Sequence, residues 1–265
     1  MINLKISIVT VCYNAVEEIE RTIQSVIHQT YSNIEYIIID GGSTDGTLDI
    51  INKYVNDISY FVSEPDKGIY DAMNKGIKVA TGEWINFMNA GDEFYNGNVL
   101  SEVFKNAVQK SDIIFGDTLI CGSHNIKYVE YASPFYEHLP LHNNAGFNHQ
   151  STFVRTTLAK SNLFDRHYKL AADYNMIISL FRQHAVFQQI HLIIAIYSLE
   201  GKSDINRKAH IYETLMIDNP DRKKYNIIMC EIIYIRTKML KYIKKIIFLM
   251  NPTLGEKLMR IKYRM

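Results

Sequence analysis

Short apolar runs alternate with amphipathic segments over the first ninety residues, and this alternation constrains the fold more than any other feature. The runs have the length of buried strands, whereas the segments between them repeat apolar residues at helical spacing, as Ile19, Ile23 and Val26 do. A repeated strand-helix order implies a parallel sheet with right-handed crossovers. We predict strands at Lys5–Val11, Glu35–Asp40, Ser59–Val62 and Trp84–Met88, and helices at Val16–His28, from a Ser43 or Thr44 N-cap to Tyr54, and at Ile69–Val79.

The pattern is weaker in the second half of the chain. The stretch from 117 to about Asn148 is loop-like, and beyond Asp204 the helical periodicity is interrupted at Asn219-Pro220 and Asn251-Pro252, because proline cannot continue a helix. We predict a helix at Val99–Gln109, a strand at Ile113–Gly116, a helix from about Asp173 to His184, a strand at His191–Tyr197, and helices in the tail.

Two of the predicted strands end in acidic loops. The run that starts at Ile34 leads into Asp40–Thr47 (DGGSTDGT), and the run that starts at Trp84 leads into Asn89–Asp92 (NAGD). In an open α/β sheet, ligands bind at the carboxyl ends of the strands, where a carboxylate with small neighbours can hold a divalent cation against a phosphate. Two acidic loops at one edge therefore predict a nucleotide and metal site.

Composition places the chain among ordinary globular proteins. It has 265 residues, of which 47% are hydrophobic and 22% are charged, and its net charge of +1 gives no general attraction for nucleic acid. Three widely spaced cysteines fit a reducing compartment. Residues 1–11 lack the features of a secretory signal, and no apolar run approaches the roughly 18 residues of a membrane span. We therefore expect a cytoplasmic protein.

Four segments occur in an order that resembles the family 2 glycosyltransferases. These segments are Thr10–Asn14 (TVCYN), Asp40–Thr47, Asn89–Asp92 and Ala172–Tyr174 (ADY). The resemblance covers roughly residues 5 to 200. It implies an inverting enzyme of the GT-A fold that transfers a sugar from a nucleotide donor, of the kind that builds bacterial surface polysaccharide. It further implies a catalytic domain at 1–203, with a donor half to about 117 and an acceptor half from about 118. The resemblance does not extend to residues 204–265, which we expect to form a basic helical appendage from their own composition.

The resemblance assigns the nucleotide base to the first two motifs. Tyr13 and Asn14 would lie against the base, and Asp40 would contact the base or the ribose. Relatives often carry a second acid where this chain has Gly41. Taken alone, a Tyr-Asn pair at a strand end is more often a turn, because Asn tolerates the left-handed conformation.

The segment Glu64–Gly76 resembles the part of such enzymes that encloses the diphosphate and sugar. Within it, Asp71 and Asn74 are three residues apart, so that they share one face of a helix and could both point toward a ribose or sugar hydroxyl. The simpler alternative is that Asp66 or Asp71 only caps a helix.

Asn89–Asp92 stands where the family has its acidic metal-binding motif, with Asn89 in place of the first acid. The resemblance makes Asp92 the metal ligand and Asn89 a donor contact. One carboxylate with diphosphate oxygens and water can bind Mg²⁺ or Mn²⁺, and the cation would neutralise charge on the leaving nucleoside diphosphate. An ordinary turn is the alternative interpretation.

The remaining motifs supply the chemistry of the acceptor. Asp173 matches the family's later acidic motif and would be the general base, with partial desolvation raising its pKa toward the working range. A helix N-cap is the alternative role. Asn148–Ser151 (NHQS) resembles a segment that lines the same cavity, so His149 and Gln150 are expected to contact the donor or the acceptor.

The tail is strongly basic. From Asp221 to Met265, twelve Lys or Arg stand against three Asp or Glu, and these cations are interleaved with large apolar residues. An amphipathic helix on the inner face of the cytoplasmic membrane would explain this, especially if the acceptor is a polyprenyl-linked saccharide. Helices that pack on the catalytic domain or form a homodimer are the alternatives.

The sequence thus predicts an α/β protein with a GT-A type, mostly parallel sheet flanked by helices. The expected activity is that of an inverting, metal-dependent, hexosyltransferase-like enzyme that uses a nucleotide-sugar donor, with UDP as the expected nucleotide. A sugar nucleotidyltransferase is disfavoured because Cys12–Val16 is not a glycine-rich phosphate loop. A non-catalytic nucleotide- or carbohydrate-binding scaffold stays open, because Gly41, Asn89 and Ala172 replace common acids.

Overall fold

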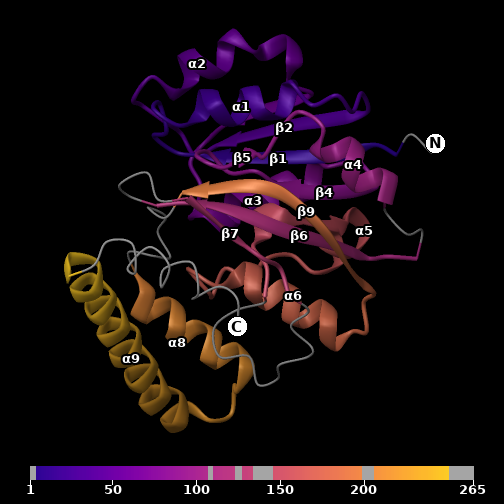
Figure 1. Ribbon diagram of the computed structural model, residues 1–265. Helices are drawn as coiled ribbons and strands as arrows, with labels where there is room; N and C mark the ends of the chain where they lie inside the picture. The colour runs from indigo at the N-terminus through magenta and orange to yellow at the C-terminus, as the bar shows by residue number, and fades with distance from the viewer. Residues whose placement is uncertain (1–3, 107–109, 123–126, 134–145, 199–205, 251–265) are drawn as a thin grey trace.

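The computed structural model describes residues 4–106, 110–122, 127–133, 146–198 and 206–250. Within these residues a nine-stranded sheet forms the centre of the protein, with strand order β3-β2-β1-β4-β8-β6-β9-β5 and β7 paired to β6. Helices flank this sheet, and a pair of helices extends from one end of it (Figure 1). The predicted α/β architecture, with a central sheet flanked by helices, is confirmed.

The first half of the sheet is parallel, as predicted. It consists of β1 (Ile6–Cys12), β2 (Ile34–Asp40), β3 (Tyr60–Ser63) and β4 (Trp84–Phe87), and Cys12 pairs with Asp40 at the carboxyl end. Alternate residues of β1 enter different cores because side chains alternate along a strand. Ile6 and Ile8 pack with α1 (Ile19–Ile27), whereas Val9 and Val11 pack with α3 (Ile69–Val79).

The second half of the sheet departs from the repeated pattern. Strand β8 (Thr152–Arg155) runs antiparallel to both β4 and β6 (Ile113–Cys121), so β4 and β6 point the same way. Strand β9 (Phe187–Ser198) is parallel to β6, while β5 (Glu93–Phe94) and β7 (Lys127–Glu130) are antiparallel additions. Six strands therefore place their carboxyl ends at one edge of the sheet within the described residues.

Several element boundaries differ from the prediction. Helix α2 (Thr47–Lys53) begins after Gly46, which has φ 99°, and neither Ser43 nor Thr44 caps it. The Ser43 hydroxyl donates instead to Asp40. Helix α4 spans Val99–Asn106, and the predicted extension to Gln109 lies outside the described residues. The short elements η1 (Val55–Asp57), η4 (His149–Ser151) and α5 (Thr156–Ser161) complete this part of the chain.

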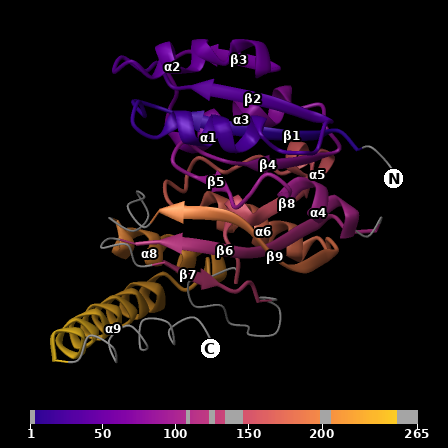
Figure 2. The same ribbon diagram turned by 45° about the horizontal axis from the view of Figure 1, so that its top comes forward.

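Three helices lie before and after β9 in the chain. Helix α6 (Ala172–Arg182) lies before β9, while α8 (Arg207–Asp218) and α9 (Lys223–Met250) form a hairpin around Ile211, Leu215 and Cys230. The predicted break at Asn219-Pro220 is confirmed, and the one at Asn251-Pro252 lies outside the described residues. Both views place α9 on the side toward which the arrow of β9 points (Figures 1 and 2).

Among the described residues, no helix has both the length and the apolarity that crossing a membrane requires. Cys12, Cys121 and Cys230 are all free cysteines.

Candidate active site

The carboxyl edge of the sheet gathers the predicted site residues from the first three motifs. Directly after β1, Tyr13 is 61% exposed and Asn14 adopts a left-handed conformation with φ 49°. The Asn14 backbone N–H donates to the Ser43 hydroxyl, and its side-chain oxygen accepts from Thr44 N–H. Asn14 therefore joins the loops after β1 and β2 and leaves the Tyr13 ring free at the surface.

Asp40 lies at the end of β2 and is fully buried. One carboxylate oxygen accepts hydrogen bonds from the backbone N–H groups of Gly42 and Ser43 and from the Ser63 hydroxyl, and the other accepts from the Ser43 hydroxyl. Burial favours a raised pKa for Asp40, but these hydrogen bonds outweigh burial and lower it. In this conformation Asp40 holds the loop that faces Tyr13, and its contact with a base or ribose stays a prediction.

Gly41, which follows Asp40, lies against an acid from another loop. A Cβ at Gly41 would stand 2.5 Å from Asp66 Oδ2 and 3.3 Å from Tyr13 Cδ2. The other Asp66 oxygen accepts from Gly68 N–H at 2.7 Å, which fixes the carboxylate in the turn before α3. The Asp66 carboxylate thus occupies the space that a side chain at position 41 would need, beside the exposed tyrosine.

Asp71 and Asn74 lie on α3 as predicted, and both fasten that helix to the segment before α6. The Asn74 amide donates to the Phe164 carbonyl and accepts from the Phe164 N–H, each at 2.9 Å. Asp71 accepts from Lys67 N–H and forms an ion pair with Arg166. Their predicted contacts with the donor stay predictions, since both side chains already have partners in the protein.

The Asn89–Asp92 turn follows β4, with Gly91 at φ 101°. Thr22 of α1 holds it in place, since its hydroxyl accepts from Gly91 N–H and donates to the Asp92 carbonyl. The Asp92 side chain is buried, and burial raises its pKa to about 7 although His149 and a hydrogen bond from Gln150 act in the opposite direction. The segment thus forms a turn that brings a carboxyl group into the site, and the metal-binding role of Asp92 stays a prediction.

His149 joins this turn to Asp173. Its Nδ1 lies 3.2 Å from Asp173 Oδ2, and its Nε2 lies 3.2 Å from Asn89 Nδ2. The hydroxyl of Tyr70, on α3, donates to the other Asp173 oxygen at 2.9 Å. The side chains of His149 and Asp173 are each 27% exposed. Residues far apart in the sequence therefore form one cluster that solvent reaches.

The expected rise in the Asp173 pKa is wrong for this conformation. Burial would raise the pKa, but the hydrogen bond and charge of His149, together with the Tyr70 hydroxyl, outweigh it and lower the pKa to about 2. For His149, burial favours a lower pKa, and Asp173 reverses that effect and raises it. The carboxylate of Asp173 is therefore kept ionised by its partner.

The residues around Asp92 supply some of the oxygen ligands that a divalent cation needs. No group of three or more His, Cys, Asp or Glu that could hold a metal ion occurs in the described part of the chain. However, Asn89 Oδ1 is buried without a hydrogen-bond partner, and burial raises the pKa of the nearby Asp92 carboxyl. Hard cations prefer such oxygen atoms and take further ligands from phosphates and water.

Helix α8 forms hydrogen bonds with the start of α6, the helix that carries Asp173. The carboxylate of Glu213 accepts from the backbone N–H groups of Lys169, Leu170 and Ala171 at 2.9, 2.8 and 3.0 Å. At the last residue of α8, Asp218 accepts from the Tyr174 hydroxyl at 2.7 Å. The appendage predicted at 204–265 therefore contacts the site-bearing helix directly.

Two of these residues were not identified from the sequence. Tyr70 stands in the Glu64–Gly76 segment, directly before Asp71, and the motif itself could have indicated it. Glu213 has no local signal, because its partners lie more than 40 residues earlier in the chain.

The mixed sheet carries the acidic loops after β2 and β4 at its carboxyl edge, where α/β sheets bind ligands. This is the arrangement expected of a GT-A type glycosyltransferase. The sequence matches the family described as "Glycosyl transferase family 2" over residues 7–172. Over 203 residues it is 30% identical to a PGL/p-HBAD biosynthesis glycosyltransferase of Mycobacterium bovis (strain BCG / Pasteur 1173P2), an alignment that covers 74% of this chain and 77% of the relative. The chain belongs to glycosyltransferase family 2.

Solved structures share the fold at lower identity. S. aureus TarS 1-349 in complex with UDP-GlcNAc superposes with a TM-score of 0.62 at 18% identity, covering 84% of this chain and 69% of TarS. A mannosyltransferase from Pyrobaculum calidifontis in complex with GDP-Man and Mn²⁺ gives a TM-score of 0.62 at 16% identity, covering 81% and 63%. The predicted GT-A fold is thereby confirmed.

Proposed function

We propose that this glycosyltransferase inverts the anomeric centre as it moves a hexose from a nucleoside diphosphate, with UDP as the first candidate, to a saccharide or lipid-linked saccharide in surface polysaccharide synthesis. One observation carries the proposal. The exposed Tyr13, the buried carboxyl of Asp92 and the ionised Asp173 come from three separate motifs and lie along one edge of the sheet. This edge offers an aromatic surface for a base, an acid for a cation and a carboxylate for a proton.

The donor would occupy the Tyr13 side of this edge. The exposed Tyr13 ring can stack on a base, and the Asp66 carboxylate beside Gly41 can accept a hydrogen bond from a base N–H or a ribose hydroxyl. Asp40, Asn14, Asp71 and Asn74 act in this proposal chiefly by holding the loops that surround the donor. The structural neighbours that bind UDP-GlcNAc and GDP-Man make both nucleotides reasonable candidates.

Asp92 would hold a divalent cation, Mg²⁺ or Mn²⁺, together with donor phosphates, and Asn89 would contact the donor through its unpaired Oδ1. Such a cation supplies charge neutralisation on the departing diphosphate. Gln150 hydrogen-bonds to Asp92, so it would fix the carboxylate orientation.

Asp173 would take the proton from the acceptor hydroxyl as that oxygen attacks the anomeric carbon from the side opposite the leaving group. Tyr70 and His149 each bind one carboxylate oxygen, which leaves further lone pairs for the acceptor proton. Because the low pKa of Asp173 makes it a weak base in this pair, we expect the acceptor to loosen the contact with His149 before proton transfer.

The testing experiment is a calorimetric titration of the protein with UDP, GDP and their common sugar conjugates, with and without Mn²⁺. Manganese-dependent binding of one nucleotide is expected. Transfer to a saccharide acceptor is then compared between the natural protein, Asp173→Asn and Asp165→Asn, where Asp165 caps a neighbouring turn. Asp173→Asn should reduce kcat by about 10²- to 10⁴-fold with donor affinity nearly unchanged. Nucleotide binding without any transfer or donor hydrolysis would instead favour a binding scaffold.

A further inference from the structure

The outer face of α9 carries a continuous apolar stripe. Its side chains are 52% to 67% exposed and are separated by alternating steps of four and three residues, which places them on one side of a helix. The opposite side, with Asn226, Cys230 and Ile233, faces α8 or the turn before α9. The stripe consists of Ile228, Ile232, Ile235, Met239 and Tyr242.

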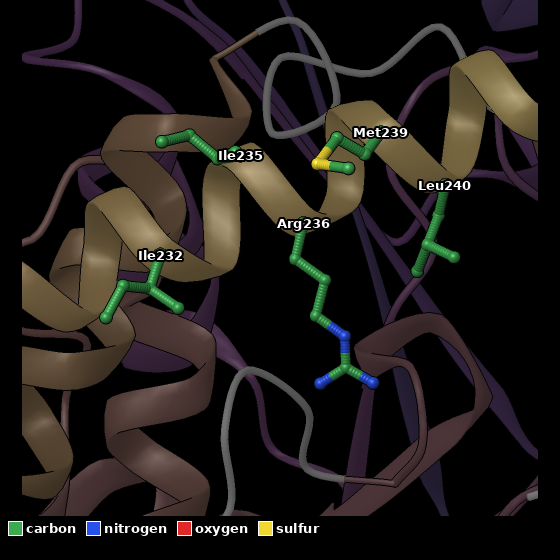
Figure 3. A pocket seen from close by; sticks show the side chains of 5 residues that line it. All are labelled: Ile232, Ile235, Arg236, Met239 and Leu240. Atoms are coloured by element: carbon green, nitrogen blue, oxygen red, sulfur yellow. The ribbon is translucent and has the colours of Figure 1, made fainter.

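The middle of this stripe borders an open surface depression. Ile232, Ile235, Arg236, Met239 and Leu240 line it. Figure 3 shows their side chains projecting from successive turns of α9, with the Arg236 guanidinium extending on the same side as Leu240. Apolar contact area and a cation are therefore offered together on one surface.

The charges on this part of the chain are mostly positive. Between Arg222 and Tyr242 the sequence has six Lys or Arg and one acid, Glu231. Glu231 is already bound to Lys208 of α8, with 2.5 Å between Nζ and Oε1. On the helix, Arg236 and Lys238 fall on opposite flanks of the stripe, since they lie one residue after Ile235 and one before Met239.

A stripe with this spacing could pack against a second copy of this chain or against a bilayer surface. The positive charge of α9 decides between these two partners. Two copies of α9 would bring their cations together, and like charges at close range oppose association. An anionic surface removes this repulsion, and each Lys or Arg near it strengthens binding by about fivefold. A helix with an apolar face and Lys or Arg at its flanks is typical of a segment that lies in the plane of a membrane interface.

We propose that the outer face of α9 binds the surface of an anionic phospholipid bilayer, with the stripe among the headgroups and upper acyl chains and the cations on lipid phosphates. Because α9 lies on the side of the molecule toward which β9 points, this contact brings the carboxyl edge of the sheet toward the bilayer (Figures 1 and 2). Helix α8 lies between α9 and α6, so the membrane contact is connected to the segment that carries Asp173.

The test is sedimentation of the full chain with vesicles, which requires neither donor nor acceptor and is therefore independent of the proposed function. Vesicles of phosphatidylcholine alone are compared with phosphatidylcholine and phosphatidylglycerol at a ratio of about two to one. One variant combines Ile232→Ser with Ile235→Ser, and another combines Arg236→Gln with Lys238→Gln. Matched controls on other surfaces are Val55→Ser with Val186→Ser, and Lys53→Gln with Lys160→Gln, all exposed positions.

The natural protein should sediment with the anionic vesicles and not with the neutral ones, and added salt should weaken binding. The stripe variant and the cation variant should each lose about tenfold or more in partitioning, while both controls bind normally and all variants keep their Tm. Absence of binding to anionic vesicles would overturn the proposal. The proposal would also be overturned by a stripe variant that binds vesicles normally but changes from dimer to monomer in light scattering, because that result would assign the face to a second copy of this chain. A stripe variant with a lowered Tm would overturn it as well, because that result would assign the face to another segment of this chain.

Discussion

Nδ1 of His149 lies 3.2 Å from Oδ2 of Asp173, and this contact sets the protonation of the site's central carboxyl group. The two residues belong to different motifs, one before β8 and the other at the start of α6. Their pairing keeps Asp173 ionised with a pKa of about 2, because it outweighs the partial burial that would raise the pKa. The same pairing raises the pKa of His149.

Replacing His149 should therefore change the pH dependence of transfer. In His149→Gln the positive charge is gone and the effect of burial on Asp173 is less opposed, so the Asp173 pKa should rise. The acidic limb of kcat/KM should then move to higher pH, and kcat should fall by about ten- to a hundredfold. Steady-state rates across the pH range measure both effects, with the exposed His28→Gln as control. An acidic limb that does not move would show that His149 does not control Asp173.

Loss of the Asp92 carboxylate should weaken donor binding only when metal is present. In Asp92→Ala the cation would lose its proposed protein carboxylate, so the enhancement of donor affinity by Mn²⁺ should fall by about tenfold or more. Calorimetry with and without Mn²⁺ measures this difference. The adjacent Glu93→Gln is the matched control, because Glu93 pairs with Arg21. Equal manganese dependence in Asp92→Ala and the natural protein would remove Asp92 from the metal site.

Glu213 should act as a positioning residue for Asp173. In Glu213→Ala three backbone N–H groups before α6 lose their acceptor, so α6 should shift and kcat should drop by about tenfold while donor affinity stays within about twofold. Glu213→Gln retains one acceptor oxygen and should restore part of kcat. Glu231→Ala breaks an ion pair inside the α8–α9 hairpin and should leave kcat unchanged. A parallel loss of kcat in both alanine variants would point to general weakening of the hairpin.

Glu35 should contribute stability that depends on pH. Burial favours a raised pKa for Glu35, but hydrogen bonds from Ser7, Thr81 and Lys5 outweigh it and lower the pKa from 4.5 to about 2. A lowered folded-state pKa adds stability above the ordinary glutamate pKa, and this stability is lost as pH falls through about 2. Glu35→Gln should thus reduce the free energy of unfolding by about 2 kcal/mol at neutral pH.

Urea unfolding of Glu35→Gln at a series of pH values measures this effect, with the exposed Glu17→Gln as control. The difference from the natural protein should shrink as the solution becomes more acidic. A difference that stays constant down to the acidic limit would mean that the amide, and not the lost charge, causes the destabilisation.

The sequence by itself determined the strands and helices of the first half, the acidic loops after β2 and β4, and the family. These features follow from local periodicity and from short motifs, which are written in neighbouring residues. Tertiary structure alone decided the place of β8 between β4 and β6, because four residues with little periodicity pair with strands far away in the chain. It also decided the low pKa of Asp173, because the opposing charge of His149 comes from another motif. The hydrogen bonds by which Glu213 holds the start of α6 were likewise decided by tertiary structure, because hydrogen bonds between distant segments leave no local pattern.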